Sequence, residues 1–97
     1  MAKQKGEILD DIERFIAKYG NNPRQWYIGT SAAPKDALTK QHNFKTGDIG
    51  LIRQAKTELQ AAEVAEFFTE RGAKGGAVIK PGNDFVYAYK ITGHTKQ

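Results

Sequence analysis

Residues 25–42, QWYIGTSAAPKDALTKQH, decide the fold that the sequence predicts. The first six of them are mostly aromatic and β-branched, which favours a β-strand, and Gly29 near the end of that strand permits a close backbone approach. Ser31 is a candidate helix cap and Pro34 suits the first turn of a helix, so a short helix should follow and run to about His42. The stretch therefore predicts a strand that leads through a tight turn into a helix.

Amphipathic helices are predicted on both sides of this stretch. Isoleucines recur every four residues between residues 6 and 19, which is the apolar stripe of a helix packed on one face. Thr57 is a candidate N-cap for a further helix over residues 57–71, and Gly72 suits its C-terminus. We expect both helices to pack their apolar faces against a sheet.

Two further strands would complete that sheet. Residues 49–55 are largely apolar, and the alternation in residues 85–91, FVYAYKI, is the strongest strand signal in the chain. Residues 77–79 could add a short extended piece. We therefore expect one α+β domain over residues 1–97, in which a small, mostly antiparallel sheet of about three strands is flanked by three helices. The core would span about 25–91, with residues 92–97 as a short tail.

The composition narrows the class of protein. A chain of 97 residues that is 39% hydrophobic and 27% charged has the balance of a single globular domain. It contains no cysteine, which excludes disulfides, cysteine-ligated zinc and thiol catalysis. No apolar run is long enough for a membrane span, and none follows the first residues as in a secretory signal. These features predict a cytoplasmic protein without a membrane partner.

The charge is unevenly distributed along the chain. The net charge is +4, and residues 31–56 and 72–97 carry an excess of lysine and arginine, whereas residues 57–71 carry an excess of glutamate. Such a pattern is usual for a solvated surface of mixed sign. It would also suit two basic walls around a site for an anionic partner, with an acidic helix beside it.

Residues 27–29, Tyr-Ile-Gly, resemble the second half of the motif of the GIY-YIG nuclease superfamily. In that superfamily a Tyr-x-Gly strand leads through a loop into a helix that bears an arginine, then a large apolar residue and often a histidine. Here the helix offers Ala37, Leu38 and His42 at those places. A strand and a helix with a metal-binding glutamate follow, so the resemblance covers Trp26 to Gly72. It implies a GIY-YIG-like fold and a small endonuclease that cleaves phosphodiester bonds. The enzyme would use a divalent metal, with Mg²⁺ as the first choice.

The resemblance also implies roles for particular residues. Tyr27, or Tyr87 in a strand permuted to residues 85–89, would polarise the attacking water with help from His42. Glu63 would be the first choice to hold the metal; Glu66 fits the spacing less well, and one register places Ala65 there. The implied catalytic positions are Tyr27, Ala37, His42, Glu63 and Tyr87. Substrate contacts are expected from Gly29, Lys35, Lys40, Lys45 and Asn83.

Alanine at position 37 is the main departure from that motif. Developing negative charge in phosphoryl transfer needs an electrostatic partner, which an alanine side chain cannot supply. Two explanations fit this residue: a nuclease whose arginine has been removed, or a natural relative that binds nucleic acid without cleaving it. The alternative function is therefore a non-enzymatic module of the phage or mobile-element type, which binds nucleic acid, with DNA favoured, or a protein.

The same residues also have ordinary structural interpretations. Tyr27 and Tyr87 could be packing aromatics of the sheet, and His42 could interact with the C-terminal end of its helix. Glu63 could be an exposed helix residue. The two sets of interpretations differ in one geometric respect, because only a site requires these side chains to meet at one concave surface.

Overall fold

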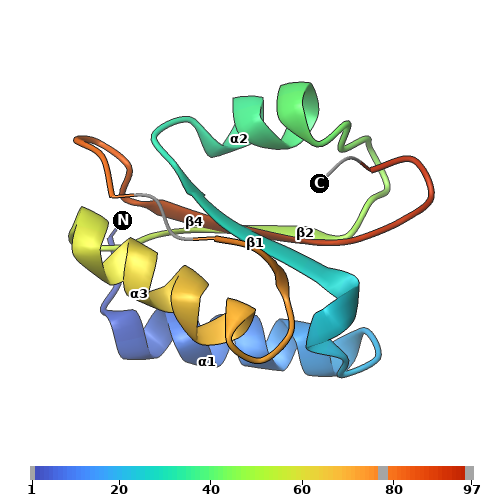
Figure 1. Ribbon diagram of the computed structural model, residues 1–97, viewed down its shortest axis with the longest axis horizontal. Coiled ribbons are helices and arrows are strands. Elements are labelled where there is room, and N and C mark those ends of the chain that lie inside the picture. The colour runs from blue at the N-terminus through green and yellow to red at the C-terminus, as the bar shows by residue number, and fades with distance from the viewer. Residues whose placement is uncertain (1, 77–78, 96–97) are drawn as a thin grey trace.

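The computed structural model describes residues 2–76 and 79–95, and in them one sheet lies between two helical layers (Figure 1). The elements are α1 (Lys5–Lys18), η1 (Pro23–Gln25), β1 (Trp26–Ser31), α2 (Pro34–Asp36), η2 (Ala37–Gln41), β2 (Gly50–Gln54), α3 (Glu58–Thr69), β3 (Lys74–Gly75) and β4 (Phe85–Lys90). Helices α1 and α3 cover one face of the sheet, and α2 with η2 covers the other. The predicted α+β class is confirmed.

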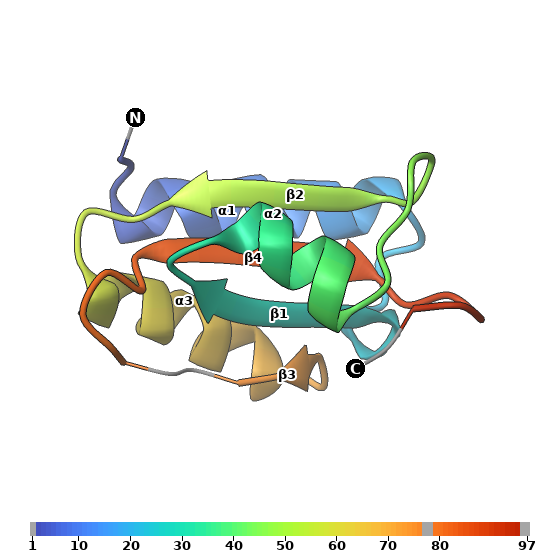
Figure 2. The same ribbon diagram turned by 90° about the horizontal axis from the view of Figure 1, so that it is seen from above.

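The described part of the sheet has four strands in the order β2-β4-β1-β3 (Figure 2). Strand β4 is antiparallel to both β1 and β2, and β3 is parallel to β1. The expected mostly antiparallel sheet is thus present, with β3 in addition to the three strands expected. Of the extended piece predicted at residues 77–79, the first two residues lie outside the described part of the chain.

Alternation along β1 and β4 sends their side chains into two separate cores. Trp26, Ile28, Val86 and Ala88 face α1 and α3, where they join the isoleucine stripe of α1. The tyrosines of the two strands face the opposite way, towards α2 and η2. This second, smaller core consists of Tyr27, Ala37, Leu38, Phe44, Ile52, Tyr87, Tyr89 and Ile91.

The helix predicted to run from Pro34 to His42 changes character along its length. It begins as the α-helix α2, and from Ala37 it becomes the π-helix η2. The amide of His42 donates to the carbonyl oxygen of Ala37, five residues earlier, at 3.2 Å. Wide turns of this kind are rare and often occur at functional sites. Here the wide turn leaves both Ala37 and Leu38 buried against the sheet.

Candidate functional site

The tyrosine-bearing face of β1 and β4 is shaped by a glycine. Gly29 pairs with Tyr87 in the antiparallel register. A Cβ atom at position 29 would lie 2.7 Å from both the Cζ and the hydroxyl oxygen of Tyr87, which is too close for any side chain. The Tyr87 ring therefore lies across the glycine, and this brings its hydroxyl group to the end of η2.

A buried histidine joins the tyrosines. His42 is 4% exposed, and its Nε2 atom lies 2.9 Å from the hydroxyl oxygen of Tyr87. Its Nδ1 atom lies 3.0 Å from the hydroxyl oxygen of Tyr89. The Tyr27 ring packs beside the imidazole with 4.4 Å between ring centroids. In the neutral form of an imidazole one nitrogen donates and the other accepts, so in that form one tyrosine donates to His42 and the other accepts from it.

A pocket of about 270 Å³ opens beside this cluster. Three of the implied catalytic positions line it, namely Tyr27, Ala37 and Tyr87, while His42 contacts it through Tyr87. The complete lining consists of Tyr27, Gly29, Thr30, Ser31, Ala37, Gln41, Gly76, Lys80, Asn83 and Tyr87. The pocket thus brings together side chains that are far apart in the sequence.

The loop before β4 closes one side of the pocket. Asn83 is 9% exposed, and its side-chain amide donates to the hydroxyl oxygen of Thr30 at 3.1 Å. The amide of Gly82 donates to a carboxylate oxygen of Glu58 at 3.1 Å. These two hydrogen bonds tie the loop to β1 and to α3. They hold the backbone next to Lys80 at the edge of the pocket.

The expected metal-binding glutamate is not at this pocket. Glu63 belongs to α3, on the other face of the sheet, and its carboxylate lies 3.6 Å from the amino group of Lys5. Glu66 is exposed on the same helix. None of the described residues that line the pocket is a carboxylate, and residues 2–76 and 79–95 contain no cluster of three potential metal ligands. The described lining therefore lacks the carboxylates through which proteins usually hold Mg²⁺.

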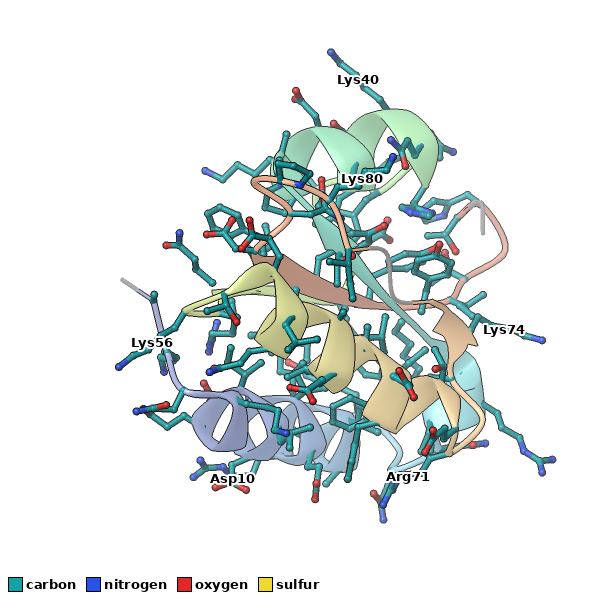
Figure 3. The ribbon with its side chains drawn as sticks, turned by 60° about the vertical axis from the view of Figure 1, so that its left-hand side comes forward. Asp10, Lys40, Lys56, Arg71, Lys74 and Lys80 are labelled. Carbon is teal, nitrogen blue, oxygen red and sulfur yellow. The ribbon has the colours of Figure 1, made fainter. Side chains whose placement is uncertain are left out.

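The three lysines expected to contact substrate are not among the described residues that line the pocket. Lys35 and Lys40 are exposed on α2 and η2, and Lys40 points away from the body of the protein (Figure 3). Lys45 is exposed in the following loop, where its backbone amide donates to Asp48 at 2.8 Å. Gly29 and Asn83, the other two expected contacts, do line the pocket.

Burial fixes the protonation state of the tyrosine hydroxyls. Desolvation is the main cause that raises the pKa of Tyr87 and of Tyr89, and the neighbouring Tyr27 raises both further. Both phenols therefore stay protonated at neutral pH, far from the condition that a general base requires. In this site they act as hydrogen-bonding groups.

Sequence reasoning missed Lys80 and Tyr89. Lys80 lines the pocket because the loop folds back over β1, a long-range effect without a local signal. It does precede Pro81-Gly82, a turn pattern that places nearby residues at the surface. Tyr89 follows Tyr87 at the two-residue spacing of one strand face, so the alternation could have identified it.

Comparisons with known proteins add no relative of this chain. No protein-family model matches it, and neither the curated proteins nor the solved structures gave a significant match. Within the described ranges, no helix is both long and apolar enough to cross a membrane. The site must therefore be interpreted from its own geometry and chemistry.

Proposed function

We propose that this domain binds nucleic acid without cleaving it, and that a backbone phosphate occupies the pocket beside Tyr27, Tyr87 and Lys80. The observation that carries the proposal is the lining itself, which combines a lysine, hydroxyl groups and an amide and has no carboxylate among its described residues. Lysine, hydroxyl and amide groups are the usual partners of phosphate oxygens. Among the described lining residues, a phosphate would meet hydrogen-bond donors and no carboxylate.

The distribution of charge also favours nucleic-acid binding on the pocket side of the sheet. Lys40 and Lys80 lie on the α2 side of the sheet, and Lys74 lies at the β3 edge, whereas Asp10 lies on the far side with α1 (Figure 3). Helix α3 adds further glutamates to that far side. Helices α1 and α3 together carry more acidic than basic side chains, so a polyanion would be favoured on the pocket side of the sheet, away from most of these carboxylates.

The chemistry of the pocket favours binding over cleavage. Ala37 brings no positive charge to the position where the resembling nucleases have an arginine. Glu63 lies across the sheet and is paired with Lys5. The raised pKa values of Tyr87 and Tyr89 disfavour proton abstraction by either phenol. Each of these features leaves phosphate binding intact.

The proposal predicts that Lys80→Glu weakens binding of a fluorescently labelled 20-nucleotide DNA by at least about tenfold at low salt, because an attractive contact becomes repulsive. Fluorescence anisotropy in about 50 mM salt measures the dissociation constant. Lys80→Ala should reduce the slope of log affinity against log salt by about one. Single-stranded DNA, duplex DNA and RNA are compared in parallel.

Lys18→Glu is the matched control, since Lys18 is also exposed but lies at the C-terminal end of α1, which covers the opposite face of the sheet (Figure 1). It should weaken binding by no more than about twofold, the scale of a screened long-range effect. If both variants lost the same affinity for nucleic acid, the pocket would not be the binding site. The absence of salt-dependent binding to all three nucleic acids would overturn the proposal itself.

A second candidate, a metal-dependent endonuclease, is favoured by one observation: position 37 lies in the same pocket as both tyrosines. If the lost arginine alone explains inactivity, Ala37→Arg should nick supercoiled DNA in the presence of magnesium, and the unchanged protein should not. Ala33→Arg, which adds the same charge at an exposed turn residue outside this pocket, is the control. No nicking by Ala37→Arg, with the fold retained by circular dichroism, would reject this candidate.

A further inference from the structure

A second and larger hollow lies on the opposite side of the sheet. It has a volume of about 590 Å³ and is bounded by the C-terminal part of α1, the start of η1 and the C-terminal end of α3. Helices α1 and α3 lie side by side in this layer (Figure 1). We call this hollow the helical groove. It shares no residue with the pocket beside Tyr27.

The floor of the helical groove is apolar. It is formed by Ile16, Ala17, Pro23, Phe67 and Phe68. Phe67 is only partly buried, and its ring meets that of Phe68 edge to face, with 5.1 Å between centroids. Partly exposed aromatic side chains are typical anchors of protein interfaces.

The rim of the groove is positively charged. Arg71 lies over the Phe67 ring, with its guanidinium carbon 3.5 Å from the ring centroid, and one of its nitrogens donates to the Phe67 carbonyl oxygen at 2.9 Å. These contacts hold the arginine at the groove. Arg14 lies on the α1 side and is 77% exposed, with a 3.6 Å contact to Asp11. Arg24 lies close by, with its side chain against Gly72. Glu13 is the acidic residue among those that line the groove.

The positive charge of the rim indicates what kind of ligand the helical groove would bind. Compensation of the helix dipoles could account for basic residues at the ends of α1 and α3, but not for an apolar hollow between them. An acidic segment that also carries large apolar side chains would satisfy both the floor and the rim. Nucleic acid suits the groove poorly, because a long polyanion would also have to cross Asp10 and Glu66 on the surrounding helix surface.

We propose that the helical groove docks an acidic amphipathic segment of a partner protein, with an apolar side chain against the apolar floor and carboxylates at Arg14 and Arg71. The domain would then hold a nucleic acid on one side of its sheet and a protein on the other. The groove does not depend on the pocket residues, so this docking stands even if the pocket binds no nucleic acid.

The test uses three synthetic helical peptides that share leucine and phenylalanine at positions i, i+4 and i+7 and differ in their flanking residues. The flanking residues are glutamate, glutamine or lysine. Titration into the ¹⁵N-labelled protein should shift the amide signals of Ala17, Phe67 and Arg71 with the glutamate peptide. That peptide should bind at least about fivefold more tightly than the lysine peptide, the scale expected for two exposed ion pairs.

Charge reversal tests the rim directly. The double variant Arg14→Glu/Arg71→Glu should reverse the preference, so that the lysine peptide binds more tightly than the glutamate peptide. Lys56→Glu, an exposed change at the other end of the helical layer, should leave the preference unaltered. Reversal of charge distinguishes an electrostatic rim from a general loss of structure, because an unfolded variant would bind neither peptide in a defined way.

Three results would overturn the proposal. The first is no shift at the groove with the glutamate peptide up to about 1 mM, a concentration at which even weak docking is visible. The second is equal affinity for the acidic and basic peptides. The third is concentration-dependent self-association, measured by sedimentation, that Arg71→Glu abolishes, since the groove would then be occupied by a second copy of this chain.

Discussion

Replacement of His42 by leucine is expected to lower the free energy of unfolding by about 2–4 kcal/mol, because it removes two buried hydrogen bonds at once. His42 bridges the hydroxyls of Tyr87 and Tyr89 at 2.9 and 3.0 Å. Tyr87 is 4% exposed and Tyr89 is fully buried, so water cannot easily replace the histidine. Leucine fills a similar volume but offers neither a donor nor an acceptor.

Urea denaturation monitored by circular dichroism measures this loss. The matched control is His94→Leu, since that side chain is 42% exposed and contacts Asp48 at the surface. The control should change the free energy of unfolding by less than about 0.5 kcal/mol, as surface substitutions usually do. Equal effects of the two variants would show that the tyrosine–histidine bonds contribute nothing measurable.

A combined variant tests whether the cost comes from the two tyrosine hydroxyls that lose their histidine partner. Replacement of both partners of a buried hydrogen bond by apolar groups is often nearly neutral. His42→Leu/Tyr87→Phe/Tyr89→Phe should therefore recover part of the stability that His42→Leu alone loses. A further loss in the triple variant would mean that packing of the rings, rather than hydrogen bonding, dominates the smaller core.

The fold was accessible from the sequence because its signals are local. The alternation in residues 85–91 predicts β4, and the isoleucine spacing predicts α1 to within one residue at each end. Strand β3 was not accessible in this way. It consists of an exposed lysine and glycine, without apolar alternation, and it is held only by pairing with β1.

The candidate site could be predicted from the sequence only in part, because some of its contacts are long-range. Tyr27, Ala37 and Tyr87 share a pocket because strand alternation and the turn after β1 fix their directions. The side on which Glu63 would lie depends on which face of the sheet α3 covers, and helix periodicity alone does not determine that. Lys80 reaches the pocket through the loop that Asn83 and Glu58 anchor, a set of contacts without a sequence pattern.

Substitution of Gly75 by alanine is expected to have the other large effect, a loss of about 2–4 kcal/mol in the free energy of unfolding, since a strained backbone and a steric overlap add together. Gly75 has φ +113°, which an L-residue rarely adopts. A Cβ atom there would also overlap the carbonyl oxygen of Ile28 and lie 2.9 Å from its carbonyl carbon. The overlap involves the β1 backbone, which cannot move without disturbing Tyr27 and Gly29 on either side of Ile28.

The next residue provides a closely matched control. A Cβ atom at Gly76 would meet no described atom within 4 Å, although the Gly76 amide donates to the same Ile28 carbonyl oxygen at 3.3 Å. Gly76→Ala should therefore change the free energy of unfolding by less than about 0.5 kcal/mol. Urea denaturation of both variants gives the comparison. If the two alanines cost the same, the close approach of β3 to β1 does not constrain the fold. If only Gly75→Ala is destabilised, the close contact between β3 and Ile28 of β1 is what holds β3 at this edge of the sheet.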